Sequence, residues 1–279
     1  MPIHDQSYRR YTGRREEPGK AWLVIARNGI LTILRKRLFI GLLILAWIPF
    51  VVGAVTIYIN ANYPQFTLLA MTAQRFRGFL SQQDFFVFVI TVWVGAGLIA
   101  NDKRANALQL YLSKPLTRLE YVIGKLAILS AFLLMVTWVP AILLLALQVA
   151  FSGSFSFLRQ NVYLFPAVTV YSCLQVMVSA FTILALSSMS KSGRYVAILF
   201  AGAWFFSHAV YGVIYAVTGS TGFSWVSLPG NLNEVGDIIF HVQHRYSTSP
   251  AVSLLAIVVV IAVSIWVLNR RVRGVEVVQ

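Results

Sequence analysis

Six long apolar stretches divide the chain, and polar or charged segments separate them. A membrane-spanning helix needs roughly 20 mostly apolar residues, and a helix satisfies its own backbone hydrogen bonds inside the bilayer. The pattern therefore predicts an all-α integral membrane protein with six transmembrane helices. The expected spans cover residues 38–59, 79–100, 121–150, 162–188, 195–217 and 251–268.

Composition supports this class. Of the 279 residues, 58% are hydrophobic and 11% are charged, whereas a soluble domain is about 25% charged. A water-soluble core of this size could not hide so much apolar surface. The composition therefore excludes a soluble globular enzyme.

The net charge of +14 is explained by membrane topology. Most basic residues fall in the two termini, in the segment after the second span and in the segment after the fourth. The positive-inside rule then predicts cytoplasmic termini, which an even number of spans also requires. We expect a multi-pass protein of the plasma membrane, specifically the bacterial inner membrane, that does not bind nucleic acid. The four basic residues on the other side are Arg75, Arg77, Arg159 and Arg245.

The N-terminal region contains two different segments. Residues 1–20 are expected to be a flexible basic N-terminus, and the long charged lead before residue 38 is unlike a signal peptide. Residues 21–37 place apolar side chains on one helical face and basic ones on the other, which predicts an amphipathic interfacial helix. A cytoplasmic extension of the first span is the alternative. The interfacial-helix residues are Trp22, Ile25, Arg27, Ile33, Arg35 and Lys36.

The longest outer segment covers residues 218–250. Residues 231–240 predict a short helix that lies on the outer membrane surface or dips into it. His241 and His244 are three residues apart on this expected helix, but two ligands make a weak metal motif, so no metal site is predicted. A cytoplasmic tail, residues 269–279, ends the chain.

Several kinds of chemistry are missing. None of the nine acidic residues is expected in the middle of a span, which disfavours an ion-coupled transporter and an intramembrane hydrolase with paired carboxylates. No P-loop motif is present, so the chain itself is not expected to bind ATP. No catalytic residue is predicted, and the chain is not expected to be an enzyme.

The most informative segment covers residues 99–125. Asn101 or Asp102 can cap a helix over 103–112, and Thr117-x-x-Glu120 is a capping box for the third span. The result is a short cytoplasmic helix between spans two and three. Its apolar stripe suits docking into a partner's groove, and lying flat on the lipid surface is an equal alternative.

In order, this segment contains Asp102, Leu108-Gln109-Leu110-Tyr111-Leu112, Ser113-Lys114-Pro115-Leu116-Thr117-Arg118 and Gly124-Lys125. With these residues it resembles a segment in the permease subunits of ABC-2-type ABC transporters, within the branch of single-domain bacterial permeases. In that family a polar or acidic start precedes a leucine-rich helix, a proline turn and a Gly-Lys pair. The order of spans and the run Leu228-Pro229-Gly230-Asn231-Leu232-Asn233 also resemble the family, whereas Asn106-Ala107 departs from it.

The resemblance implies a permease subunit that moves a substrate across the plasma membrane, by export in most of the family. A second permease copy or paralogue and separate P-loop ABC ATPase subunits would be its partners, and the ATPases would bind ATP and Mg²⁺. A membrane-embedded assembly or scaffold subunit without transport of its own is the alternative. The implied ATPase-coupling residues are Asp102, Lys103, Arg104, Ala105, Leu108, Gln109, Leu112 and Pro115. The candidate path residues are Trp93, Gly95, Gly97, Gly202 and His208.

Overall fold

We describe the protein from a computed structural model, which covers residues 21–63, 72–107, 117–151 and 161–272. In these ranges every regular element is a helix and no strand occurs. The helices before residue 105 are α1 (Ala21–Leu34), α2 (Arg37–Ala46), α3 (Ile48–Asn62), α4 (Ala73–Ile90), a π-helical turn (Thr91–Gly95), α5 (Ala96–Leu98) and α6 (Ala100–Arg104). The later ones are α8 (Arg118–Val136), α9 (Trp138–Phe151), α11 (Leu164–Met189), α12 (Gly193–Thr218), a 3₁₀ helix (Thr221–Val226), α13 (Leu228–Ile239) and α14 (Pro250–Arg271).

All six expected spans are confirmed as helices long and apolar enough to cross a membrane. The second differs most from its prediction, because the helix begins well before residue 79. The six long helical stretches are Arg37–Asn62, Ala73–Arg104, Arg118–Phe151, Leu164–Met189, Gly193–Thr218 and Pro250–Arg271.

Three of these stretches contain an irregularity. The first is interrupted at Trp47, just before Pro49 in the opening turn of α3, and the second contains the π-helical turn. The third is interrupted at Thr137, between α8 and α9. Pro140 lies one turn later and has no N–H to donate to the preceding turn. The proline therefore accounts for the interruption of the third span at Thr137.

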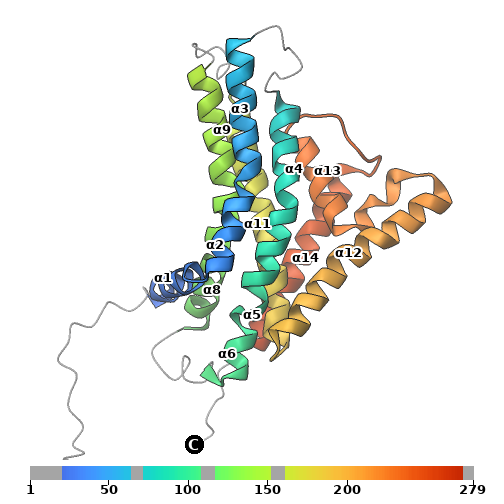
Figure 1. Cartoon of the computed structure of the whole chain (residues 1–279). Coiled ribbons are helices and arrows are strands. Elements are labelled where there is room, and N and C mark those ends of the chain that lie inside the picture. Colours follow the sequence, from blue (N-terminus) through green and yellow to red (C-terminus); the bar gives the residue numbers. More distant parts are fainter. Residues whose placement is uncertain (1–20, 64–71, 108–116, 152–160, 273–279) are drawn as a thin grey trace, which may run out of the picture.

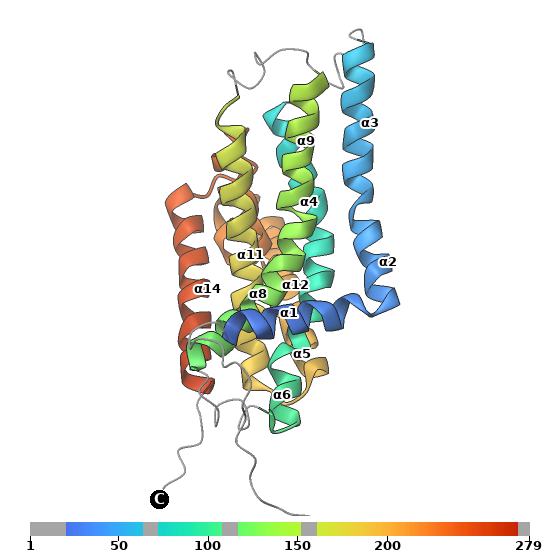
Figure 2. The ribbon, with the colours of Figure 1, turned by 90° about the vertical axis from the view of Figure 1, so that its left-hand side faces the viewer.

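The helices form a bundle around α11 (Figure 1). α11 is the most buried of the long helices, whereas α12 and the first span are largely exposed. Exposed apolar side chains such as Phe206 (71% exposed) and Val217 (81% exposed) cover α12. In a membrane such surfaces face lipid or another apolar helix. The chain enters α1 and leaves α14 at the end of the bundle where α6 lies, called the α6 end below (Figures 1 and 2).

α1 lies across the bundle at the α6 end, nearly at right angles to the long helices (Figure 2). It ends at Leu34, and a break at Arg35 and Lys36 separates it from α2. The alternative interpretation, a straight extension of the first span, is therefore wrong. Residues 1–20 and the end of the tail, 273–279, lie outside the described residues.

The segment that is expected on the outer side forms a helix, α13, which packs into the bundle. α13 begins earlier than expected, because the Ser227 hydroxyl accepts a hydrogen bond from Gly230 N at 3.0 Å and caps it. Its contacts with α4, α11, α12 and α14 show that it dips between helices. His241 and His244 follow the end of α13 and do not share a helical face. Within the described ranges, no three His, Cys, Asp or Glu side chains gather as a metal site.

Candidate functional site

At the α6 end, one carboxylate connects the second long helix to the third. Asp102 on α6 accepts a hydrogen bond from the Tyr121 hydroxyl at 2.8 Å. The same oxygen lies 2.7 Å from Lys125 Nζ, and both charged side chains are less than one-fifth exposed. Asp102 lies within the first turn of α6 and does not cap it. Its carboxylate thus holds the start of α8 beside the end of the second span.

Gly124 explains how α1 crosses so near this ion pair. A Cβ atom at Gly124 would lie 2.9 Å from Ile25 Cβ and 3.1 Å from the Trp22 carbonyl oxygen, both on α1. Any larger residue would push α1 away from α8. Gly124-Lys125 therefore has two roles in this structure: the glycine admits α1, and the lysine pairs with Asp102.

A serine of α11 fixes the irregular stretch where α5 meets α6. The Ser187 hydroxyl accepts hydrogen bonds from the backbone N–H groups of Ile99 (3.1 Å) and Ala100 (3.0 Å). It also donates to the Ala96 carbonyl at 2.9 Å. One turn later, Lys103 Nζ donates to the Ser188 carbonyl oxygen. α6 is therefore attached to α11 as well as to α8.

The tip beyond this attachment is exposed. Arg104 and Ala105 have no buried face, and the chain turns at Asn106, whose φ of 53° is in the left-handed region. The helix expected over 103–112 does not begin at Lys103, because Lys103 already lies within α6, which begins at Ala100. Four predicted coupling residues lie outside the described residues, namely Leu108, Gln109, Leu112 and Pro115.

The capping box at the start of the third span is confirmed. The Thr117 hydroxyl accepts a hydrogen bond from Glu120 N at 3.2 Å, and the Glu120 carboxylate accepts one from Thr117 N at 2.9 Å. The helix accordingly begins at Arg118, ahead of the expected residue 121.

The predicted faces of α1 are separated in space. Trp22, Ile25 and Ile33 are partly buried, and α1 packs mainly on α8. The three basic residues Arg27, Arg35 and Lys36 are exposed. The apolar stripe therefore contacts protein, whereas Leu23, Val24 and Leu31 are exposed on the same side of α1 as Arg27.

The five candidate path residues do not form one surface. Trp93 and Gly97 line two neighbouring pockets at the α6 end. Gly95 is buried against α11, where a Cβ atom would lie 2.6 Å from Ile183 Cγ2. Gly202 is exposed on α12, and a Cβ atom added there would have no neighbour within 4 Å. His208 Nδ1 lies 3.0 Å from the Ser227 hydroxyl, which links α12 to the start of α13.

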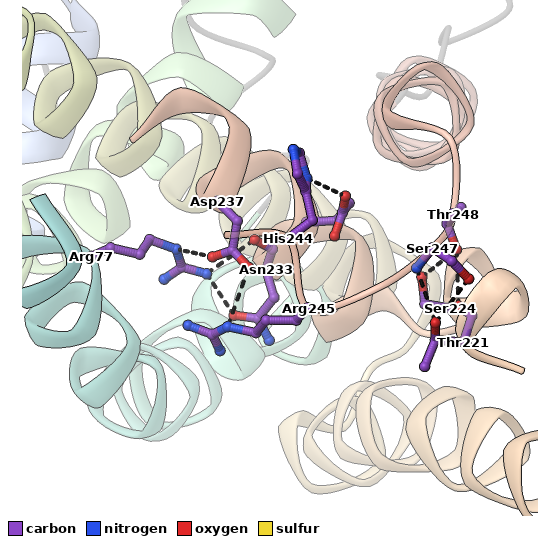
Figure 3. A network of polar contacts seen from close by, with 10 residues as sticks. Arg77, Thr221, Ser224, Asn233, Asp237, His244, Arg245, Ser247 and Thr248 are labelled. Atoms are coloured by element: carbon purple, nitrogen blue, oxygen red, sulfur yellow. Dashed lines mark hydrogen bonds and ion pairs between the residues drawn. The ribbon is translucent and has the colours of Figure 1, made fainter. Parts of the chain in front are cut away.

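Toward the other end of the bundle, a buried ion network joins α4 to α13 (Figure 3). Arg77 Nε donates to Asp237 Oδ1 at 3.0 Å, and both side chains are fully buried. The Arg77 Nη2 group donates to Asn233, to its carbonyl oxygen at 3.2 Å and its side-chain oxygen at 2.8 Å. Arg245 Nε lies 3.2 Å from the second carboxylate oxygen of Asp237. The carboxylate is therefore held between two guanidinium groups.

This network extends to α11. The Arg77 guanidinium carbon lies 4.8 Å from the centre of the Tyr171 ring. Gly236 permits this approach, because a Cβ atom there would lie 2.6 Å from both Arg77 Nε and Tyr171 Cε2. The Glu234 carboxylate on α13 lies 2.8 Å from Nδ1 of His244, which follows the end of the helix. α13 is thus fixed by charges as well as by apolar packing.

One expectation about acidic residues is wrong. Asp84 lies on α4, inside the second span, and accepts a hydrogen bond from Gln175 near the middle of α11. Glu234 and Asp237 are fully buried on α13. A carboxylate therefore does lie at mid-span. The acidic residues of this chain consequently give no argument against ion-coupled transport.

The sequence contains one signal for this network. Arg77 and Asp84 are seven residues apart, and Asn233 and Asp237 are four apart, so each pair shares a helical face. The sequence pattern places most of this network in water, because Arg77 precedes the expected second span, 79–100, and residues 218–250 are expected outside the membrane. Burial also lies behind the raised pKa of Tyr246, next to Arg245 in the following loop.

Comparisons with protein-family models and with curated proteins give no match. A function for this chain is therefore inferred from its own residues and their arrangement.

Proposed function

We propose that this chain is the permease subunit of an ABC transporter of the ABC-2 type. Together with a second permease copy or paralogue it would form a path through the plasma membrane. Separate P-loop ATPase subunits would bind ATP and Mg²⁺ on the cytoplasmic side. With both termini cytoplasmic, the α6 end faces the ATPases and α13 lies toward the outer side.

The attachment of the α6 tip is the observation that best supports this proposal. Asp102 connects α6 to α8, and Ser187 and Lys103 connect it to α11. A displacement of Arg104 or Ala105 would therefore be transmitted to two further long helices, α8 and α11. A loop that only joins two spans would not need these contacts.

ATP can drive such a permease only through differential contacts. An ATPase that fits the tip better in one arrangement of the bundle shifts the population toward that arrangement. Coupling energies between distant sites are typically about 1–3 kcal/mol. The long second helix runs from the α6 tip to Arg77 and α13, so movement at one end would reach the outer side through one continuous element.

Replacement of either of two exposed alanines by aspartate tests the proposal. Ala105 is exposed at the α6 tip, and Ala61 is exposed at the opposite end of the bundle. We expect Ala105→Asp to release the ATPase or abolish stimulation of its hydrolysis, because a new charge disrupts an apolar docking contact. Ala61→Asp, the matched control, should leave both unchanged. Equal ATPase association and activity in both variants would contradict the coupling role of the tip and favour a scaffold subunit.

A further inference from the structure

An open groove separates α1 from the second long helix at the α6 end. Its volume is about 490 Å³, within the roughly 300–1,000 Å³ of ligand pockets. Val24, Asn28 and Lys36 line one side, and Trp93 and Asn101 line the other. The path and coupling roles proposed above leave this groove without a ligand.

The polar part of the groove carries a positive charge without a carboxylate partner among the described residues. Two lysines, Lys36 and Lys125, and one carboxylate, Asp102, line it. Lys125 and Asp102 pair at 2.7 Å and offset one another. Lys36 is exposed at the break between α1 and α2, and no ion pair is formed by it within the described ranges. The groove therefore favours an anion near Lys36.

The apolar part of the groove indicates that this anion is attached to an apolar chain. Val24 and Ile33 of α1 line this part, together with Trp93, Val94 and Leu98 of the second long helix. Trp93 is 44% exposed, and its ring lies 6.4 Å from that of Phe39. Tryptophan rings prefer the boundary between lipid headgroups and acyl chains. A soluble anion would gain nothing from this apolar side.

We infer that the groove binds an anionic phospholipid. Its phosphate lies against Lys36 and the amides of Asn28 and Asn101, and an acyl chain leaves between Val24 and Trp93. Basic pockets between membrane helices bind anionic headgroups in this way. The lipid fills the groove between α1 and the second long helix and so supports the position of α1. The inference requires only a membrane around the bundle and does not depend on an ATPase partner.

Quenching of tryptophan fluorescence by brominated lipid tests this site. The full chain is reconstituted in phosphatidylcholine vesicles that contain a minor fraction of brominated phosphatidylglycerol, or of brominated phosphatidylcholine for comparison. We expect preferential quenching by phosphatidylglycerol, and Trp93→Phe should remove the selective component. Lys36→Gln should lower the preference for phosphatidylglycerol about fivefold, because one lysine near an anionic phosphate raises the affinity by about this factor.

Arg35→Gln is the matched control, because Arg35 is an exposed neighbour that does not line the groove. It should leave the preference unchanged. Equal losses in Lys36→Gln and Arg35→Gln would show only diffuse attraction and overturn the site, as would quenching of wild type in proportion to lipid fraction. Inorganic phosphate added at constant ionic strength should not reduce the selective quenching. If it does, the groove binds a soluble anion and the lipid assignment is wrong.

Discussion

The buried network around Asp237 predicts an asymmetry between the two members of its buried ion pair, Asp237 and Arg77. Asp237→Asn removes the carboxylate that lies between two guanidinium groups, and it leaves Arg77 buried without an anion at 3.0 Å. Removing one partner of a buried ion pair costs about 3–5 kcal/mol. Arg77→Met leaves Asp237 paired with Arg245 at 3.2 Å, so it should cost only the lost hydrogen bonds, about 1–3 kcal/mol.

The double variant measures the pair directly. In Asp237→Asn with Arg77→Met no unpaired buried cation remains, so the combined loss should be smaller than the sum of the single losses by about 0.5–3 kcal/mol. Arg245→Gln is the control, because its side chain is 40% exposed and such pairs contribute about 0–1 kcal/mol.

The assay is the free energy of unfolding in mixed micelles, followed by tryptophan fluorescence. It is measured for the wild type, the two single variants, the double variant and the control. A larger loss for Arg77→Met than for Asp237→Asn, or strictly additive losses, would refute the assignment of Asp237 as the centre of the network.

Two further predictions concern the α6 end. Gly124→Leu should lower the free energy of unfolding by about 1–3 kcal/mol, because its Cβ atom would lie 2.9 Å from Ile25. Gly41→Leu, with open space around it, should change this free energy little. Equal losses in the two variants would count against the close crossing of α1. In a Cys173→Ala background, Arg35→Cys should react with an impermeant thiol reagent only after the cells are opened. Labelling of intact cells from the outside would show the opposite orientation, with the α6 end facing outward.

The spans and the capping box can be predicted because their causes are local. Apolar length defines a span, and Thr117 and Glu120 satisfy each other's backbone within one turn. The tertiary use of polar residues cannot be predicted in this way. Arg77 and Asp237 are 160 residues apart, and nothing near either one identifies the other. The sequence pattern therefore places these charges in water, although the pair is buried.

The α6 end can be predicted only in part, for the same reason. The sequence indicates a short, partly apolar helix after the second span. It does not reveal that Asp102 is engaged with Lys125 and Tyr121 through the packing of α6 on α8. Trp22, Ile25 and Ile33, the apolar stripe of α1, are partly buried, whereas Arg27 is exposed. The partner of that stripe, α8, is not predictable, because an amphipathic pattern does not distinguish a lipid surface from a protein surface.

The most direct test of the proposed function is purification of the chain from its native membrane in mild detergent. The bound proteins are identified by mass, and ATP hydrolysis by the complex is measured. The account predicts a stoichiometric P-loop ATPase of the ABC type, whose association or activity is lost in Ala105→Asp and kept in Ala61→Asp. The account would be contradicted if the chain purifies without an ATPase and if ATP changes no measured activity of the membranes that contain it.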